Sequence, residues 1–305
     1  MSEDLLDCPL CEARDFRELY VTRDQHYGTD GWHRVVQCTH CSLVFLNPMF
    51  SDQELAALYP GDYYAYQDNF RRPRWKEVAK ALLGYRIAPK EPQFEVPGTV
   101  LDLGCGSGWF LQAMRARGWM TYGVEISKAA SLLGQSQGLQ IFCGTLQQAN
   151  FRPELFDYVR SNHSFEHMTC PNETLEEIYR ILKPGGRLLI GVPNIDGLTA
   201  RVFERYWWQL CAPFHAFNYS VKTLSQLLVK HYFSIDRITY NSDYAGILGS
   251  LQIYSNRNNH RKSSEGLLIN STPLRLLCHW LAKSVDLFGM GDVIEITARR
   301  VSKPA

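Results

Sequence analysis

Two pairs of cysteines near the N-terminus have the spacing of metal ligands. Cys8 and Cys11 form one Cys-x-x-Cys pair, Cys38 and Cys41 form the other, and 26 residues separate the pairs. Two such pairs on a hairpin place four thiolates tetrahedrally around a structural zinc ion. The sequence therefore predicts a Zn²⁺ site made of all four cysteines. Two alternatives stay open: reduced cysteines without a metal, and a redox pair, although neither pair precedes a helix of a βαβ unit, where redox pairs occur.

Histidines and a glutamate form a second group that could do chemistry. They lie in residues 162–167, directly after a predicted strand. Histidine is the usual general base near neutral pH. We expect His167 to be the first candidate for a catalytic base, His163 the second and the more distant His215 the third. In the alternative interpretation, Glu166 and His167 cap the next segment and bond the backbone. The aromatic residues before His215 would be core packing or a substrate wall.

A glycine-rich turn is the third feature. Gly104, Gly106 and Gly108 follow the short apolar strand predicted at 99–102 and precede a predicted helix. Glycine lets a ligand approach the backbone closely and permits left-handed turn conformations. A dinucleotide site would need the pattern G-x-G-x-x-G. Here the third glycine comes one residue early, and Trp109 stands where that pattern has its last glycine. The turn by itself indicates either a ligand site or a purely structural turn.

Glu125 is a second indication that the glycine-rich turn binds a ligand. It follows the second predicted strand, 120–124, and so stands beside the turn in a doubly wound sheet. A carboxylate there can accept hydrogen bonds from both hydroxyls of a ribose, each worth about 1.5–3 kcal/mol as a bond to a charged group. The turn and Glu125 together predict a nucleoside site. In the alternative, Glu125 is a solvated acid at a strand end.

The elements that position these residues alternate between strand and helix. We expect strands at 99–102, 120–124, 139–143, 158–161 and 187–192, with helices at 109–117, 128–136 and 174–182. Alternation at this spacing implies βαβ units with right-handed crossovers and a parallel sheet. Farther on we expect a helix at 222–230, strands at 233–240 and 293–300, and a helix near 274–288; the remainder of 245–292 shows no clear pattern. The sequence thus predicts an α/β fold with a doubly wound, mostly parallel sheet.

Four motifs occur in order and at suitable intervals along this predicted sheet. They are the turn segment 101–108, the segment 123–127 around Glu125, the pair Phe156-Asp157, and residues 182–186 before the fifth strand. Over roughly residues 97–240 the series resembles class I S-adenosylmethionine-dependent methyltransferases. The resemblance implies their Rossmann-like sheet, S-adenosylmethionine as the cofactor, and transfer of its methyl group.

The same resemblance implies a role for each residue of the first two motifs. Gly104, Gly106 and Gly108 would line the methionine moiety of the cofactor. Asp102 would hold the turn and the amino group, and Glu125 would bind the ribose.

The adenine and the sulfonium would be contacted by residues outside the turn. Ile126 would flank the adenine, and Thr145 and Leu146 would reach its edge, although the family often has an acidic residue where Thr145 stands. Tyr64, with Tyr63 beside it, resembles the lid aromatics over the sulfonium, where a cation–π contact contributes roughly 0.5–2 kcal/mol.

The cysteine-containing part resembles the zinc-binding head that precedes methyltransferase domains in bacterial sugar, polysaccharide and natural-product pathways. Residues 1–47 would form this zinc-ribbon-like module, with a hairpin around 28–31. Residues 48–96 would form a helical, aromatic lid and linker, and residues 97–305 the methyltransferase domain. The head would act as a wall on the substrate side, and its zinc would stabilise the fold.

Residues 163–167 have the pattern His-x-x-Glu-His. It is similar to the Glu-x-x-Glu-His segment that holds a divalent metal in ubiquinone O-methyltransferases and small-RNA 2′-O-methyltransferases. His163 replaces the first glutamate, so the oxygen-rich site suited to magnesium is weakened. A second metal at His163, Glu166 and His167 stays open.

Charge and composition exclude several classes of protein. The 305 residues carry a formal net charge of +1, so no overall field attracts nucleic acid or anionic lipid. The apolar runs are too short to span a bilayer, and the acidic N-terminus lacks the features of a secretory signal. Nine cysteines, five of them scattered singly, indicate a reducing compartment. We expect a cytoplasmic protein with neither a transmembrane segment nor a nucleic-acid partner.

The expected function is methyl transfer from S-adenosylmethionine to a small-molecule acceptor, a sugar nucleotide or another cell-surface or natural-product intermediate. Two rivals stay open. One is a tRNA or protein methyltransferase that uses the zinc module as a macromolecule reader, although no basic run accompanies the cysteine pairs. The other is a catalytically inactive binding module of the same fold. The sequence does not indicate which acceptor atom is methylated.

Overall fold

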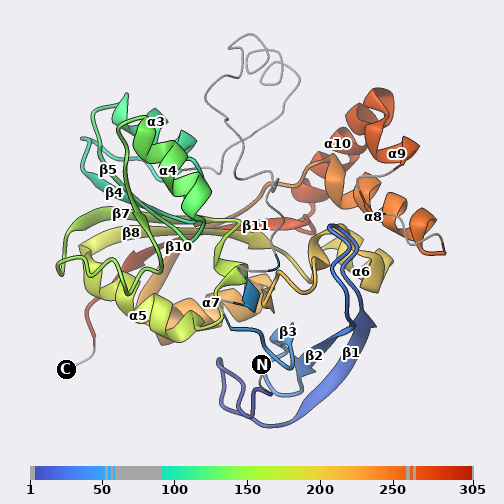
Figure 1. The fold of residues 1–305 in the computed structure, drawn as a ribbon. Helices are drawn as coiled ribbons and strands as arrows, with labels where there is room; N and C mark the ends of the chain where they lie inside the picture. Colours follow the sequence, from blue (N-terminus) through green and yellow to red (C-terminus); the bar gives the residue numbers. More distant parts are fainter. Residues whose placement is uncertain are drawn as a thin grey trace.

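The computed structural model of the chain describes residues 4–51, 54, 55, 58, 91–258, 262, 263 and 266–303. A seven-stranded sheet forms the centre of the larger part, and a four-stranded sheet contains the N-terminal strands. Helices from the C-terminal part lie above the smaller sheet in the view of Figure 1.

The central sheet has the strand order β10-β11-β8-β7-β4-β5-β6. Its strands are β4 (Thr99–Leu103), β5 (Met120–Glu125), β6 (Gln140–Cys143), β7 (Phe156–Asn162), β8 (Leu182–Pro193), β10 (Phe233–Tyr240) and β11 (Val293–Arg300). The strands from β8 to β6 pair in parallel, and β11 is antiparallel to both β8 and β10. The expected mostly parallel α/β sheet is confirmed. Strand order reverses between β4 and β7, which makes their carboxyl ends the place where open α/β sheets bind ligands.

Helices cover both faces of this sheet (Figure 1). On one face lie α3 (Trp109–Arg115) and α4 (Lys128–Ser136), and on the other lie α5 (Pro171–Ile181) and α7 (Val221–Lys230). Phe110 of α3 packs with Val100 of β4 in one core cluster, whereas Ile178 of α5 and Leu224 of α7 belong to the main cluster. The doubly wound arrangement therefore follows from apolar helix faces that need a sheet face to cover them.

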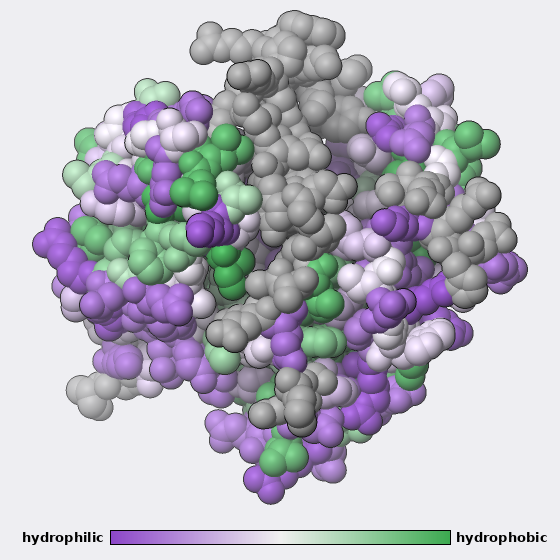
Figure 2. Space-filling model, in the orientation of Figure 1, coloured by the Kyte–Doolittle hydropathy of each residue, from purple (hydrophilic) through white to green (hydrophobic). Residues whose placement is uncertain are grey.

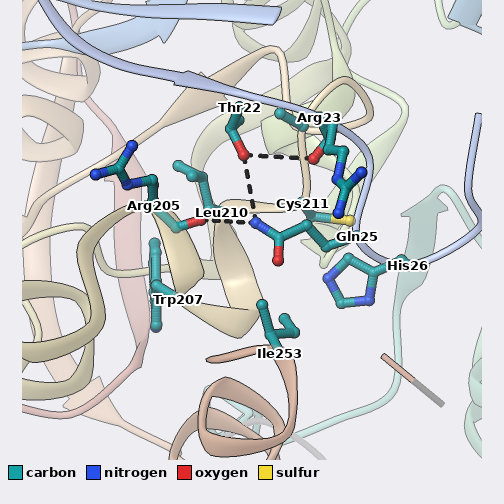
Figure 3. A pocket seen from close by; sticks show the side chains of 10 residues that line it. Thr22, Arg23, Gln25, His26, Arg205, Trp207, Leu210, Cys211 and Ile253 are labelled. Atoms are coloured by element: carbon teal, nitrogen blue, oxygen red, sulfur yellow. Dashed lines mark hydrogen bonds between the residues drawn. The ribbon is translucent and has the colours of Figure 1, made fainter. Parts of the chain in front are cut away.

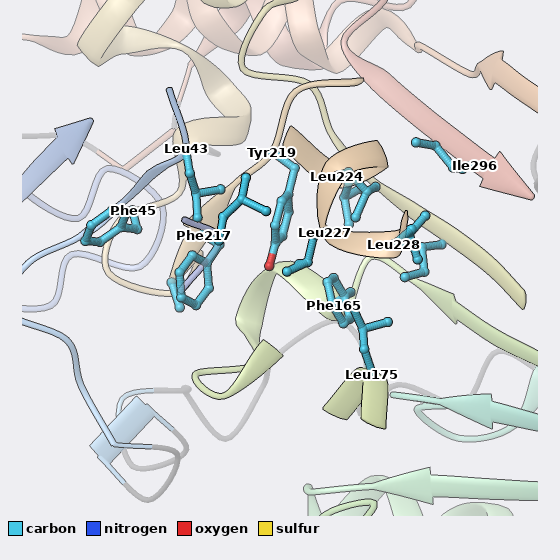
Figure 4. Packing of buried hydrophobic residues seen from close by; sticks show 14 of the residues in the cluster. Leu43, Phe45, Phe165, Leu175, Phe217, Tyr219, Leu224, Leu227, Leu228 and Ile296 are labelled. Atoms are coloured by element: carbon cyan, nitrogen blue, oxygen red, sulfur yellow. The ribbon is translucent and has the colours of Figure 1, made fainter. Parts of the chain in front are cut away.

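The N-terminal part is built on a sheet of order β1-β2-β3-β9. Its strands are β1 (Phe16–Thr22), β2 (His33–Cys38), β3 (Val44–Leu46) and β9 (Phe217–Asn218), the last of which follows β8 in the chain. β1 and β2 form the expected hairpin. Phe45 of β3 is the register partner of Phe217, and Tyr219 connects the Phe217 ring to that of Phe165 (Figure 4). The cysteine-containing part and the central sheet thus share one hydrophobic core.

A group of helices packs beside the carboxyl end of β8. It comprises α6 (Leu198–Phe203), α8 (Tyr244–Asn256), α9 (Leu267–Asn270) and α10 (Thr272–Leu287). The helix expected near 274–288 corresponds to α10, but α8 has no counterpart in the sequence prediction. Glycine lowers helix propensity, and α8 uses Gly246 and Gly249 where neighbours come closest. A Cβ at Gly249 would lie 2.2 Å from the Trp208 ring. Close packing therefore requires glycine in α8, and these glycines weaken the helical pattern of its sequence.

The surface seen in Figure 2 is largely hydrophilic around the N-terminal sheet and α5, with hydrophobic residues in small patches. Among the described residues, no helix combines the length and apolar character needed to cross a membrane.

Candidate active site

The glycine-rich turn lies at the switch point, directly after β4. Gly104, Gly106 and Gly108 have φ values of 69°, 54° and 88°, in the left-handed region that favours glycine. A Cβ at Gly104 would come within 2.4 Å of the Cβ of Ser164. Ser164 also donates a hydrogen bond from its hydroxyl to the Leu103 carbonyl at 2.6 Å. The segment after β7 therefore closes directly on the turn.

Glu125 reaches the same turn from the end of β5. One of its carboxylate oxygens accepts a hydrogen bond from the N–H of Gly106 and the other from the N–H of Ser127, both at 2.8 Å. Burial raises the pKa of Glu125, while these backbone hydrogen bonds act in the opposite direction. A carboxylate oxygen has two lone-pair directions. Each oxygen of Glu125 can therefore still accept a hydrogen bond from a ligand hydroxyl.

Asp102, which was predicted to hold the turn and an amino group, is 2% exposed and ion-paired. Nη1 of Arg160 donates to its Oδ1 at 2.6 Å. Nε of Arg160 lies 3.3 Å from Oε1 of Glu91, and the guanidinium lies over the Phe110 ring, 4.2 Å from its centroid. Burial opposes the charge of Arg160, but Asp102 and Glu91 outweigh it and raise its pKa. The carboxylate beneath the turn thus has a permanent cation beside it.

Arg160 was not among the residues predicted from the sequence to form the site. It is the only charged residue in the second half of β7, where its neighbours Val159 and Ser161 are both fully buried. Because a charged side chain is almost never fully buried without a partner, a lone arginine in a buried strand was the available signal. Glu91 is tied to the same place by the hydroxyl of Tyr158, which donates to its carboxylate.

The residues predicted around an adenine lie on the β6 side of Glu125. Ile126 is 47% exposed, and Leu146 is buried in the main core. The N–H of Thr145 donates to Oε1 of Gln148 at 2.9 Å. Tyr64, with most of the predicted lid, lies outside the described residues.

A buried cluster centred on Glu166 follows β7. The short helix η3 (Phe165–His167) carries Glu166 and His167, and His215 comes from the connection after β8. Glu166 is 1% exposed, and among the described residues neither of its oxygens has a partner at hydrogen-bonding distance. Nδ1 of His163 lies 3.7 Å from its Oε1, and Nε2 of His215 lies 3.9 Å from the same atom. The structure thus brings all three predicted histidines to one carboxylate.

Backbone carbonyls orient two of these histidines. Nδ1 of His167 lies 2.8 Å from the Phe214 oxygen, and Nδ1 of His215 lies 2.7 Å from the Gln209 oxygen. Since a carbonyl only accepts, Nδ1 of each ring donates to its carbonyl, and in a neutral ring this leaves the proton on Nδ1. One donor atom from each of Glu166, His167 and His215 lies within 4.8 Å of the other two. Ring nitrogens of two histidines and one carboxylate therefore converge.

The ionisation states in the cluster differ between its members. Burial lowers the pKa of His215 to about 3, so this ring is neutral at neutral pH. Burial opposes the charge of Glu166, but the surrounding histidines outweigh it and lower its pKa to about 2. Burial also opposes a charge on His163, yet Glu166 raises its pKa overall. Glu166 thus favours the cationic form of His163.

The N-terminal part forms one wall of this region. The ring of His26 meets that of Trp208 edge-on at 4.6 Å, and its Nε2 lies 2.8 Å from the Trp208 carbonyl. Tyr27 packs against Phe214 at 5.0 Å. Beside this wall is a small hollow with room for about one water molecule, lined by residues between 22 and 26, between 205 and 212, and by Ile253 (Figure 3). Trp207 is buried in the core, whereas Trp208 stands between His26 and α8.

The four N-terminal cysteines come together beside β2. Sγ of Cys8 lies 3.5 Å from Sγ of Cys41, and Sγ of Cys11 lies 3.5 Å from Sγ of Cys38. All four sulfurs lie within 4.8 Å of one another, and none is in a disulfide. Zinc–sulfur bonds of about 2.3 Å give a tetrahedron whose sulfurs are about 3.8 Å apart. The observed spacing therefore fits a four-coordinate zinc ion.

Comparisons with known proteins agree with this geometry. Residues 68–236 match the family model described as a methyltransferase domain. The chain is 35% identical over 103 residues to malonyl-[acyl-carrier protein] O-methyltransferase of Erwinia billingiae (32% of this chain, 40% of that protein). It is 31% identical over 102 residues to ubiquinone biosynthesis O-methyltransferase of Pseudomonas putida (31% and 44%). The chain thus spans less than half the length of these two relatives.

A solved structure extends the comparison to most of the chain. A chain from the complex between the Haloferax volcanii Trm112 methyltransferase activator and a methyltransferase superposes with a TM-score of 0.54 at 20% identity. The match covers 80% of this chain and 97% of that chain. At this identity the likeness shows a shared fold.

Replacing Arg160 with methionine tests the charge cluster beneath the turn. We expect the free energy of unfolding to fall by about 3–5 kcal/mol near neutral pH, because Asp102 and Glu91 lose their buried cation. Burial already raises the pKa of Asp102 and of Glu91, and without the guanidinium that opposes this their folded-state pKa values rise further, so the loss should shrink as the pH falls from about 8 to about 5. Denaturant titrations at both pH values measure this.

The matched control is Lys183→Met, which removes a half-exposed ion pair with Asp157 of 2.8 Å. It should cost less than about 1 kcal/mol and show little pH dependence. An Arg160→Met loss that equals the control, or that does not change with pH, would contradict a buried charged cluster.

Proposed function

The chain belongs to the methyltransferase domain family, and from this membership we propose that it transfers the methyl group of S-adenosylmethionine to a hydroxyl group of a small molecule. The observation that carries the proposal is the contact between two groups of residues. The turn with Glu125 offers a nucleoside site, and the segment that carries Glu166 closes on that turn through Ser164. Cofactor and acceptor would therefore meet at the carboxyl ends of β4 and β7.

The cofactor site that we propose uses the turn, Glu125 and the charges beneath them. Glu125 would accept hydrogen bonds from the ribose hydroxyls, and Ile126 would flank the adenine. Asp102 and Glu91 outnumber the single guanidinium of Arg160. This excess of negative charge supports a ligand with a sulfonium and an ammonium group.

The acceptor that we propose is a sugar nucleotide or a related intermediate with an acidic group. The hollow beside Trp207 is bordered by Arg23, Arg205 and Gln25, although the guanidinium of Arg205 points away from it and the Gln25 amide donates to Thr22 and to the Arg205 carbonyl (Figure 3). Guanidinium groups bind phosphate and carboxylate groups through paired hydrogen bonds. The acidic group of the acceptor would lie at the edge of this hollow, beside Arg23. Cys211, which also lines the hollow, accepts a backbone hydrogen bond from His215, so this edge leads toward the cluster around Glu166.

The cluster around Glu166 would activate the acceptor hydroxyl, and its donors fit a divalent metal. The convergent atoms are a carboxylate oxygen and one ring nitrogen from each of His167 and His215, and each histidine is oriented through Nδ1 by a backbone carbonyl, as metal-bound histidines often are. This set favours zinc, iron, cobalt or manganese over magnesium. A bound metal would lower the pKa of a coordinated hydroxyl group.

The chain's own residues would do the positioning. His167, Glu166 and His215 would hold the acceptor oxygen beside the sulfonium, since in-line methyl transfer depends on alignment. His163 would balance the charge of Glu166. If the cluster binds no metal, His167 becomes the candidate base, because its Nε2 can accept the hydroxyl proton.

Glu125→Ala tests the cofactor site. We expect the affinity for S-adenosylmethionine to fall by about 2–4 kcal/mol, because two ribose hydroxyls lose a charged acceptor. Isothermal titration calorimetry on the purified variant measures this. Glu154→Ala, which removes a half-exposed carboxylate paired with Arg300, should bind like the parent. Equal affinity of the parent and Glu125→Ala would remove Glu125 from the site, and a parent that binds no cofactor would favour an inactive binding module.

His215→Ala tests the cluster through metal content as well as activity. We expect mass spectrometry to find two metal ions per parent chain, one in the cluster and one at the cysteines. The variant should lose one ion and keep its cofactor affinity, while its catalytic rate falls roughly 10²–10⁴-fold. His231→Ala replaces another buried histidine, which bonds Asn172 at 2.7 Å, and should keep both ions.

Other outcomes of that experiment have definite meanings. If the parent holds a single metal ion, the metal role of the cluster is wrong and His167→Ala decides between base and packing. A base predicts a rate loss of roughly 10²–10⁴-fold with unchanged melting temperature. Packing predicts a lower melting temperature, with activity in proportion to the folded fraction.

Replacing Cys8 and Cys38 together with serine tests the structural zinc. We expect the double variant to lose one zinc ion and to melt at a lower temperature, because the folding of such sites is coupled to metal binding. Cys143→Ser, at an exposed single cysteine, should keep the metal and the melting temperature. A double variant that retains all of its zinc would contradict the site.

A further inference from the structure

The outward face of α10 carries no charged side chain. The exposed residues Leu277, Trp280, Leu281, Ser284, Leu287 and Phe288 recur at helical intervals and form one line along it, here called the α10 stripe. Leu277 is 56% exposed, Trp280 55% and Phe288 77%. Single exposed apolar residues are ordinary on a monomer, but a continuous stripe of them marks an interaction surface.

The three charged residues of α10 all have partners inside the chain. Arg275 donates to the carbonyl of Ile269 at 2.5 Å. Lys283 lies 3.4 Å from Asp286 and donates to the side chain of Asn241 at 3.1 Å. These charges lie on the flanks and on the inward side of the helix, so the stripe itself is uncharged.

We propose that the α10 stripe is the interface through which two copies of this chain form a dimer, with α10 packed against its counterpart across a twofold axis. A twofold interface uses the same patch on both subunits, so the patch must complement itself. An uncharged apolar stripe meets this condition. A partner with a charged surface would find no opposite charge on it.

The size of the stripe agrees with a dimer. From their exposed fractions, Leu277, Trp280, Leu281, Leu287 and Phe288 offer roughly 600–700 Å². A standard interface buries about 800 Å² on each partner, and the neighbouring surface would supply the remainder. Trp280 lies in the middle of the stripe, where interfaces concentrate their binding energy in aromatic residues. The small Ser284 beside it permits close approach of the two helices.

A membrane surface is the other apolar occupant to consider. Helices that lie on membranes carry lysine and arginine along their polar edge, where these attract anionic headgroups. The cations of α10 are half-buried and partnered within the chain. The observations therefore favour a second copy of the chain.

Sedimentation equilibrium on the purified full-length chain tests the proposal. The chain has a mass of 35.0 kDa, and we expect twice this mass at micromolar concentration. Trp280→Glu and Leu287→Glu, made separately, should each weaken the dimer at least about 100-fold by burying an unpaired charge. Both should keep the parent's far-ultraviolet circular dichroism, and Leu287→Glu alters only the last residue of the helix. Val229→Glu, at a 60% exposed position of α7, should remain a dimer.

Three results would overturn the proposal. The first is a parent that stays monomeric up to about 100 μM, a concentration at which an interface of this size associates. The second is a dimer that persists in both glutamate variants. The third is a monomeric parent that cosediments with vesicles of equimolar phosphatidylcholine and phosphatidylglycerol while Trp280→Glu does not, which would assign the stripe to a membrane surface.

Discussion

A buried guanidinium joins the two strands at the point where the sheet can bind a ligand. Arg160 and Asp102 are register partners on β7 and β4, and their ion pair lies directly beneath the glycine turn. Glu91 brings the segment that enters the domain to the same guanidinium. Removing a charge from water costs several kcal/mol, so each of these groups requires the others. The geometry of the turn therefore depends on an electrostatic contact as well as on its glycines.

The cluster around Glu166 depends on the N-terminal part of the chain in a comparable way. His215 lies just before β9, and β9 pairs with β3, the strand that follows the last of the four cysteines. Tyr27 of the hairpin packs on Phe214, whose carbonyl orients His167. A loss of order near the cysteines would thus reach the histidines through backbone pairing and ring packing. The cysteine-containing part therefore supports the position of the histidine cluster.

The sequence was sufficient where local pattern determines structure and insufficient where distant segments meet. The strands at 233–240 and 293–300 follow from apolar alternation alone. β9 has two residues and exists only because β3 lies beside it, so no local pattern could predict it. The three histidines could be named from their chemistry. Their approach to Glu166 depends on the connection after β8, where Glu204 and Cys211 adopt left-handed backbone conformations that their residue types do not indicate.

Glu166 is buried and accepts no hydrogen bond from the described residues; its neighbours His163 and His215 lie 3.7 Å and 3.9 Å away. A buried carboxylate without hydrogen bonds costs far more than one that accepts two or three, and a purely structural role would be served better by glutamine or by an apolar side chain. Burial, together with the negative charge of Glu166, raises the pKa of Tyr219, whose buried hydroxyl has no hydrogen-bond partner among the described residues. His163 offsets part of the charge at 3.7 Å without closing a hydrogen bond. Such a site is stabilised when a cation or a proton donor enters between the carboxylate and the ring nitrogens of His167 and His215. These observations support the proposal that the cluster around Glu166 binds a cation or a proton donor.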